Sequence, residues 1–216
     1  MKRQARRELV AALLQQRDFS SLADLAGRET GVGTLLLQFL FDPHDLLCWR
    51  AIEGLGQVAR AHPQQVEKLI GRLLYMLNED SGSTGWSAAA ALGEIARCQL
   101  SVIREIVPMF CGFLEEAFSR PAMLWGVGRL AEVHPEVLEE VRPFIRACLE
   151  DAGPEVRGLA AWCLGSLGDA PAIPALERLA KDDGLFPLYE AGEMRQARVG
   201  ELARKALERL GPGQGH

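Results

Sequence analysis

Apolar side chains recur every three or four residues along most of this chain and rarely at every second residue. This spacing places them on one face of a helix, so it predicts a mostly helical protein. The opening stretch Arg3–Gln16 is an example, because Leu9, Ala12 and Leu13 fall on one face. A shorter helix is expected around Ser20–Gly27, and helical hairpins follow from about residue 31.

Leu or Val followed by Gly recurs within the helical stretches at a nearly constant interval. The glycines, which are Gly56, Gly93, Gly128 and Gly165, lie 37, 35 and 37 residues apart. A fixed period of this length is typical of stacked helical hairpins. Because Gly costs about 1 kcal/mol relative to Ala inside a helix, its recurrence predicts that neighbouring helices approach closely at these positions.

Proline and glycine mark the limits of the expected hairpins. His62-Pro63 and His134-Pro135 each end one helix and begin the next. Within the last hairpin, apolar alternation on both sides of Ala191-Gly192 predicts a small β-hairpin near residues 185–198. The expected helix pairs are Val32–Phe41 with Asp45–Ala61, Pro63–Leu77 with Thr84–Arg97, Val102–Phe118 with Pro121–Val133, Pro135–Glu150 with Pro154–Leu167, and Ala170–Lys181 with Val199–Leu210.

These limits predict a single domain over residues 1–211 and a disordered, glycine-rich tail over 212–216. Residues 1–29 form N-terminal capping helices. The polar segment Asn78–Gly85 is a long loop for its place in the repeat, which fits either a solvated connection or a functional loop. The expected repeats cover approximately residues 30–62, 63–98, 99–134, 135–168 and 169–211.

One segment, from Asp151 to Asp183, resembles the HEAT-like repeat of the phycobilisome-lyase type. The resemblance implies an all-α fold, a right-handed α-solenoid (α-α superhelix) of about five HEAT-like hairpins. It also implies a ladder between an Asp and an Arg six residues later, which Asp151 and Arg157 match, whereas Arg120 keeps only the basic half. The matching residues are Asp151, Pro154, Val156, Arg157, Ala160, Ala161, Leu164, Gly165, Gly168, Asp169, Ala175, Leu176, Asp182 and Asp183.

All four tryptophans fall on one side of the second helices of the hairpins. Trp49 and Trp86 lie seven residues before their repeat glycines, and Trp125 and Trp162 lie three before theirs. Residues four apart share a helix face. The resemblance implies that this face lines the concave surface. The predicted partner-binding residues are therefore Trp49, Arg50, Glu53, Trp86, Glu94, Trp125, Arg129 and Trp162.

Two interpretations of this tryptophan face remain open. In the first, the rings are structural: they cover small neighbours such as Gly54 and Gly158, or are themselves covered by the N-terminal helices or the 185–198 segment. In the second, a protein partner binds an aromatic-lined groove, because exposed apolar patches mark interaction sites and Trp and Arg are favoured interface anchors.

Composition narrows the functional classes. The net charge of −5 argues against general nucleic-acid binding, although Lys2, Arg3, Arg6 and Arg7 form a basic cluster that suits a solvated helix face or an anionic docking patch. No stretch is apolar for the roughly 20 residues that span a bilayer, and no secretory signal is apparent. Five cysteines without a CxxC pair indicate structural thiols in a reducing cytoplasm.

We find no catalytic set in the sequence. It has no His-Glu dipeptide, which HEAT-like deoxyhypusine hydroxylases use for their di-iron site, and no P-loop. We therefore expect a non-catalytic, cytoplasmic, monomeric protein-binding scaffold or assembly adaptor, with no cofactor, no metal, no nucleic acid and no membrane insertion. The alternative is a lyase or chaperone-like protein that binds a planar ligand such as a bilin in the tryptophan-lined groove.

Overall fold

The computed structural model describes residues 3–78 and 85–211. The predicted tail 212–216 and most of the predicted loop 78–85 lie outside these residues. The chain divides into two compact units, Met1–Arg104 and Glu105–His216. Both are built mainly from helices, and the second also carries a two-stranded antiparallel sheet, which confirms the predicted all-α class with one small β-hairpin. Within the described part, no helix is long and apolar enough to cross a bilayer.

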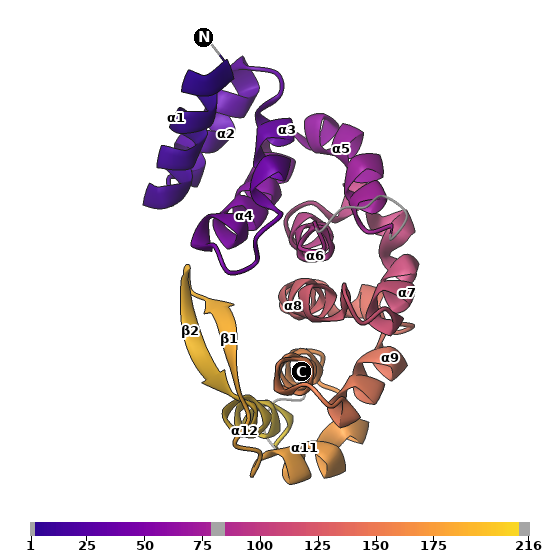
Figure 1. The fold of residues 1–216 in the computed structure, drawn as a ribbon. Coiled ribbons are helices and arrows are strands. Elements are labelled where there is room, and N and C mark those ends of the chain that lie inside the picture. The colour runs from indigo at the N-terminus through magenta and orange to yellow at the C-terminus, as the bar shows by residue number, and fades with distance from the viewer. Residues whose placement is uncertain (1–2, 79–84, 212–216) are drawn as a thin grey trace. The chain divides into compact units, whose positions relative to one another are not determined.

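The first unit opens with the two predicted capping helices, α1 (Arg3–Gln16) and α2 (Phe19–Arg28). The side chain of Asp18 caps α2 by accepting a hydrogen bond from the Ser21 N–H at 3.0 Å. Figure 1 shows α1 and α2 side by side, and both contact α4 (Leu46–Ala61). A β-carbon added at Gly54 of α4 would lie 2.8 Å from the Leu22 side chain, so α2 packs directly on this helix.

Two hairpins complete this unit. In the first, α3 (Val32–Leu36) continues as the 3₁₀ helix η1 (Leu37–Phe39) and pairs with α4. In the second, α5 (Pro63–Met76) pairs with α6 (Ala88–Cys98), and the short helix η3 (Leu100–Val102) follows. Pro63 stands in the first turn of α5, as predicted. The helix expected from Thr84 begins only at Ala88.

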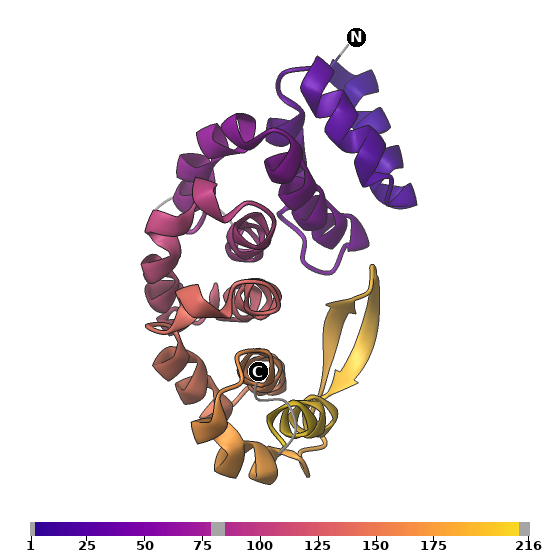
Figure 2. The same ribbon diagram turned by 180° about the vertical axis from the view of Figure 1, so that it is seen from behind.

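In the second unit, the second helices of the hairpins are continuous and the first helices are broken (Figure 2). Each break lies near a proline that cannot donate a backbone hydrogen bond, namely Pro108, Pro143 or Pro174. The prediction of one continuous helix over each of these stretches is therefore wrong, because each consists of two or three short helices. The continuous helices are α8 (Arg120–Ala131), α10 (Pro154–Ser166) and α12 (Val199–Leu210). The broken ones are η4 (Arg104–Met109) with α7 (Phe110–Glu115), η5 (Pro135–Leu138) with α9 (Arg142–Ala147) and η6 (Cys148–Glu150), and η7 (Ala170–Ala172) with α11 (Ile173–Leu179).

Two of the repeat glycines, Gly56 and Gly165, mark close helix contacts, as predicted. A β-carbon at Gly56 would lie 2.9 Å from the Glu94 side chain, where α4 meets α6. At Gly165, it would lie 2.7 Å from the Cα of Ala206, where α10 meets α12. A larger residue at either position would push its neighbouring helix away.

An arginine ladder links successive hairpins of the second unit. Arg120 donates to Asp151 of the next repeat at 2.7 Å, and Arg157 donates to Asp182 at 2.8 Å. Each arginine also donates to backbone carbonyls five and six residues before it. Arg157 thus reaches only the backbone oxygen of Asp151, and the carboxylate of Asp151 binds Arg120. The predicted pairing within one repeat is corrected to a pairing between repeats.

The β-hairpin has the predicted limits. Strands β1 (Leu185–Glu190) and β2 (Glu193–Arg198) pair in antiparallel register, with Leu185 opposite Arg198 and Glu190 opposite Glu193. The connecting residues Ala191 and Gly192 have φ angles of 54° and 92°. Positive φ at both central residues is the type I′ geometry that matches the twist of paired strands.

Candidate functional site

On α4, two of the predicted partner-binding residues bind the N-terminal segment instead of facing solvent. Arg50 is buried and donates to the backbone oxygen of Gln15 at 2.6 Å. Glu53 is also buried and accepts a hydrogen bond from Arg17 at 3.2 Å. These charged groups therefore hold the end of α1 and the following turn against α4.

The other predicted residues of the first unit differ in accessibility. Trp49 is buried, and its Nε1 donates to the Pro43 carbonyl at 2.8 Å. Glu94 is fully buried, and accepts a hydrogen bond from the Arg97 Nε at 2.8 Å. In contrast, Trp86 is 40% exposed and lies in the turn before α6, not on the helix itself, because α6 begins only at Ala88. Among the predicted residues of this unit, only the Trp86 ring is broadly open to solvent.

In the second unit, the β-hairpin covers Trp125. This ring is 2% exposed, and its Nε1 donates a hydrogen bond to the backbone carbonyl of Tyr189 at 3.0 Å. The centroids of the Trp125 and Tyr189 rings lie 6.0 Å apart. Arg129 lies 5.7 Å from the Trp125 ring centroid and forms an ion pair with Glu132 at 3.2 Å. The interpretation in which the 185–198 segment covers a ring is thus confirmed at Trp125.

The Trp162 ring packs between α10 and α8. A β-carbon added at Gly128 would lie 2.5 Å from its ring, so this half-buried side chain spans from α10 to α8. The small neighbours that the rings were expected to cover are covered by other groups. Phe186 of β1 lies against Gly158, and leucines of the capping helices lie against Gly54. At Gly54 and Gly158, the atoms nearest to an added β-carbon thus belong to leucines and to Phe186, not to a tryptophan ring.

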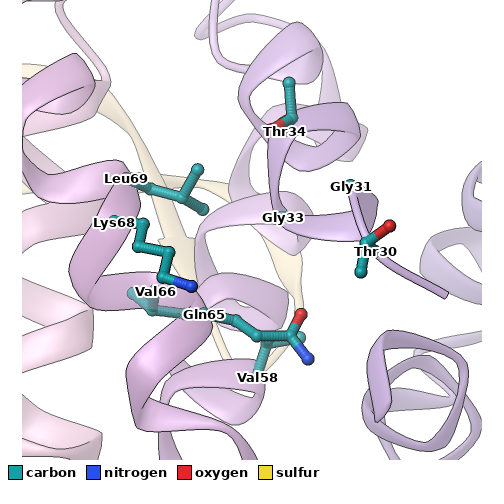
Figure 3. Close-up of a pocket in the computed structure, with 9 residues that line it drawn as sticks. All are labelled: Thr30, Gly31, Gly33, Thr34, Val58, Gln65, Val66, Lys68 and Leu69. Carbon is teal, nitrogen blue, oxygen red and sulfur yellow. The ribbon is translucent and has the colours of Figure 1, made fainter. Parts of the chain in front are cut away.

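A pocket that the sequence does not reveal lies between α3 and α5 (Figure 3). It has a volume of about 250 Å³. Gly33 of α3 permits this arrangement, because a β-carbon there would lie 2.5 Å from the Leu69 side chain of α5. The lining residues are Thr30, Gly31, Gly33, Thr34, Val58, Gln65, Val66, Lys68 and Leu69.

A second pocket of about 250 Å³ lies between the later turns of α5 and the segment from η1 to Phe41. Its exposed rings, Phe41 and Tyr75, are the most exposed aromatic side chains of the described residues. The lining residues are Leu37, Gln38, Phe41, Arg72, Tyr75 and Met76. Sequence spacing could have placed Lys68, Arg72 and Tyr75 on one side of α5, but the facing residues follow only from packing.

The cysteines are held in their thiol form by burial. Burial raises the pKa of Cys48, Cys98 and Cys148 to about 11, and it raises the pKa of Cys163 well above its usual value. Thiols with such pKa values are poor nucleophiles near neutral pH. Within residues 3–78 and 85–211, no cluster of three or more His, Cys, Asp or Glu side chains is arranged to hold a metal ion.

The sequence matches a family model described as HEAT repeats over residues 120–188, which run from α8 into β1. None of the curated proteins matches the chain. Among solved structures, an engineered protein aligns with a TM-score of 0.52 and 18% identity, covering 94% of this chain and 98% of its own. A second engineered protein aligns at 0.51 and 18%, covering 94% and 96%.

A designed armadillo repeat protein in complex with the peptide (KR)4 also aligns, with a TM-score of 0.51 and 19% identity, covering 94% of this chain and 98% of its own. Identities this low establish the fold alone. The phycobilisome-lyase type and the planar-ligand alternative stay predictions, since nothing in these comparisons bears on them. Residues 120–188 therefore match HEAT repeats, and the chain as a whole has the fold of the armadillo-type repeat structures with which it aligns.

Proposed function

We propose that this protein is a non-catalytic binding scaffold or assembly adaptor, whose protein partner engages the side of the second helices that carries the tryptophans. The HEAT- and armadillo-type fold is typical of protein-binding scaffolds. The observation that carries the proposal is the accessibility of Trp86, which is 40% exposed and lies two residues before α6 begins at Ala88. A large, rigid, partly apolar ring at the surface is the side chain most often used as an interface anchor.

The predicted site residues then take two roles. In the first unit, Trp86 is the proposed anchor; in the second unit taken by itself, Arg129 and Trp162 are the half-exposed members of the predicted set. Trp49 and Trp125, which donate hydrogen bonds to backbone carbonyls within their own units, support the surface from beneath. The designed armadillo protein in complex with the (KR)4 peptide supports the idea that this architecture can provide an elongated peptide-binding surface.

The proposal is tested by affinity capture from the source organism with the wild-type chain and two variants. Trp86→Ala removes the exposed ring and is expected to abolish capture of the partner. Met109→Ala is the matched control, because Met109 is a similarly exposed apolar side chain at 48% and is not part of the predicted surface. Far-ultraviolet circular dichroism checks that both variants remain folded. If Trp86→Ala captures the same partner as wild type, the tryptophan face is not the binding surface.

A further inference from the structure

Two pockets follow one another along α5, the first against α3 and the second against η1 and Phe41. Lys68 lines the first pocket, and Arg72, one helical turn later, lines the second. We call this surface the α3–α5 groove; it runs from Thr30 and Gln65 at one end to Phe41 and Tyr75 at the other. At 1.5 Å per helical residue, the ten residues from Gln65 to Tyr75 give it a length of about 15 Å.

The charge of this groove is opposite to that of the chain as a whole. The protein carries a net charge of −5, yet no Asp or Glu lines either pocket. In the described part of the chain, neither Lys68 nor Arg72 makes a side-chain hydrogen bond or an ion pair, and both are exposed. Arg157 of the second unit, in contrast, is paired with a carboxylate. The groove thus holds two adjacent cations that no acidic side chain among the described residues neutralises.

One end of the groove is apolar. Phe41 is 47% exposed and Tyr75 is 63% exposed, on the two sides of the second pocket. Leu37 and Met76, which are buried, complete its apolar lining. Exposed rings in a polar surrounding mark a surface that gains free energy when a partner covers it.

We propose that the α3–α5 groove binds an acidic peptide segment, separately from the tryptophan face. The spacing of the cations defines the sequence that fits. Four helical residues separate Lys68 from Arg72 by about 6 Å, and two residues of an extended peptide span about 6.6 Å on one side of the strand. Two acidic residues at alternate positions therefore pair with the two cations. An aromatic residue two positions later reaches Phe41 and Tyr75.

A peptide fits this groove better than a small anion does. Small-molecule sites enclose most of the ligand surface, whereas Thr30, Lys68, Arg72 and Tyr75 are all exposed and leave the groove open along its length. Five extended residues span about 16 Å, which matches the estimated length of the groove. Binding that rests on exposed ion pairs also weakens as salt rises.

The test measures fluorescence anisotropy of a fluorescein-labelled Gly-Glu-Ser-Glu-Ser-Phe-Gly peptide added to the full chain. Saturable binding that weakens with salt is expected. Replacing both glutamates by lysine in the peptide removes binding, and moving them to adjacent positions weakens it. In the protein, Lys68→Glu combined with Arg72→Glu weakens binding about tenfold or more, because two ion pairs become two repulsions. Tyr75→Ala weakens it without changing its salt dependence.

The matched control is Lys181→Glu combined with Lys205→Glu, which makes the same change in net charge in the second unit. If this pair weakens binding as much as the groove pair does, the attraction is general and the proposal is wrong. Displacement of the peptide by millimolar inorganic phosphate would identify a small-anion site instead and would equally overturn it. An absence of saturable binding to the wild-type chain would also refute it. The partner-capture experiment with Trp86→Ala tests the tryptophan face alone, so its outcome does not affect the proposal for the α3–α5 groove.

Discussion

Replacing Gly165 by alanine adds one methyl group where α10 meets the backbone of α12. That β-carbon would lie 2.7 Å from both the Cα and the Cβ of Ala206 in α12. The Cα is backbone, so no side-chain rotation can relieve the overlap. Carbon atoms pack at about 3.5–4.0 Å, so α12 must move away from α10 by about 1 Å.

Two opposing effects set the magnitude. Overpacking a tight contact costs about 1–3 kcal/mol, and exchanging glycine for alanine inside a helix returns about 1 kcal/mol. Because backbone is displaced, we place the cost at the upper end and expect Gly165→Ala to lower the free energy of unfolding by about 1–2 kcal/mol. The matched control is Gly71→Ala in α5, where an added β-carbon would meet nothing within 4 Å. There, only the propensity gain remains, and we expect a stabilisation of about 0.5–1 kcal/mol.

The assay is urea unfolding followed by circular dichroism, in which a shift of the midpoint at constant slope reports a change in stability. The two substitutions are expected to shift the midpoint in opposite directions. Adding Ala206→Gly to Gly165→Ala should recover only part of the loss, because the contact with the Cα persists. If Gly165→Ala stabilises the protein as Gly71→Ala does, the repeat glycines are not there to let helices touch.

Three further predictions concern other elements. Ala191→Asn should raise the free energy of unfolding by about 0.5–1 kcal/mol in the same urea assay, because Asn tolerates the positive φ of this turn position better than Ala; a destabilised variant would contradict the turn geometry. Burial raises the pKa of Asp182, but hydrogen bonds from a backbone N–H and from Arg157 outweigh it, so the pKa lies below its usual value. Its contribution to stability is therefore present above about pH 4 and lost at lower pH, and Asp182→Asn should reduce the drop in the urea midpoint between pH 7 and pH 3. Burial raises the pKa of the Cys111 thiol less than it raises the pKa of the other four thiols, so Cys111 should react with iodoacetamide first, as read by mass spectrometry of the alkylated peptides.

The sequence predicted correctly those helices and strands whose limits are set by neighbouring residues. The limits of α1, α12 and the β-hairpin follow from apolar spacing and from the Ala191-Gly192 turn, and the structure reproduces them. The sequence predicted continuous first helices in the later hairpins, but these helices are interrupted near Pro108, Pro143 and Pro174, which cannot donate a backbone hydrogen bond. Apolar spacing still continues through such breaks, because successive short helices keep burying the same face, so periodicity alone could not locate them.

The candidate site could be predicted only as far as helix faces. Positions four apart place the tryptophans on one side of their helices, but the rotamer of each ring and the segment opposite it decide what the ring contacts. Trp162 turns back onto Gly128, and Trp125 meets Tyr189, which lies 64 residues further along the chain. Neither contact has a signature in the spacing of the repeat.

The ladder shows where a sequence pattern gives the right residues and the wrong partners. Asp151 and Arg157 are six residues apart, and the repeat pattern pairs them. Yet an arginine at the start of α10 can donate both to the backbone before it and to a carboxylate of the following repeat, and Arg157 does both. Asp151 is thereby left to accept from Arg120. Arg120 therefore has a carboxylate partner in the next repeat, although no acidic residue stands six positions before it.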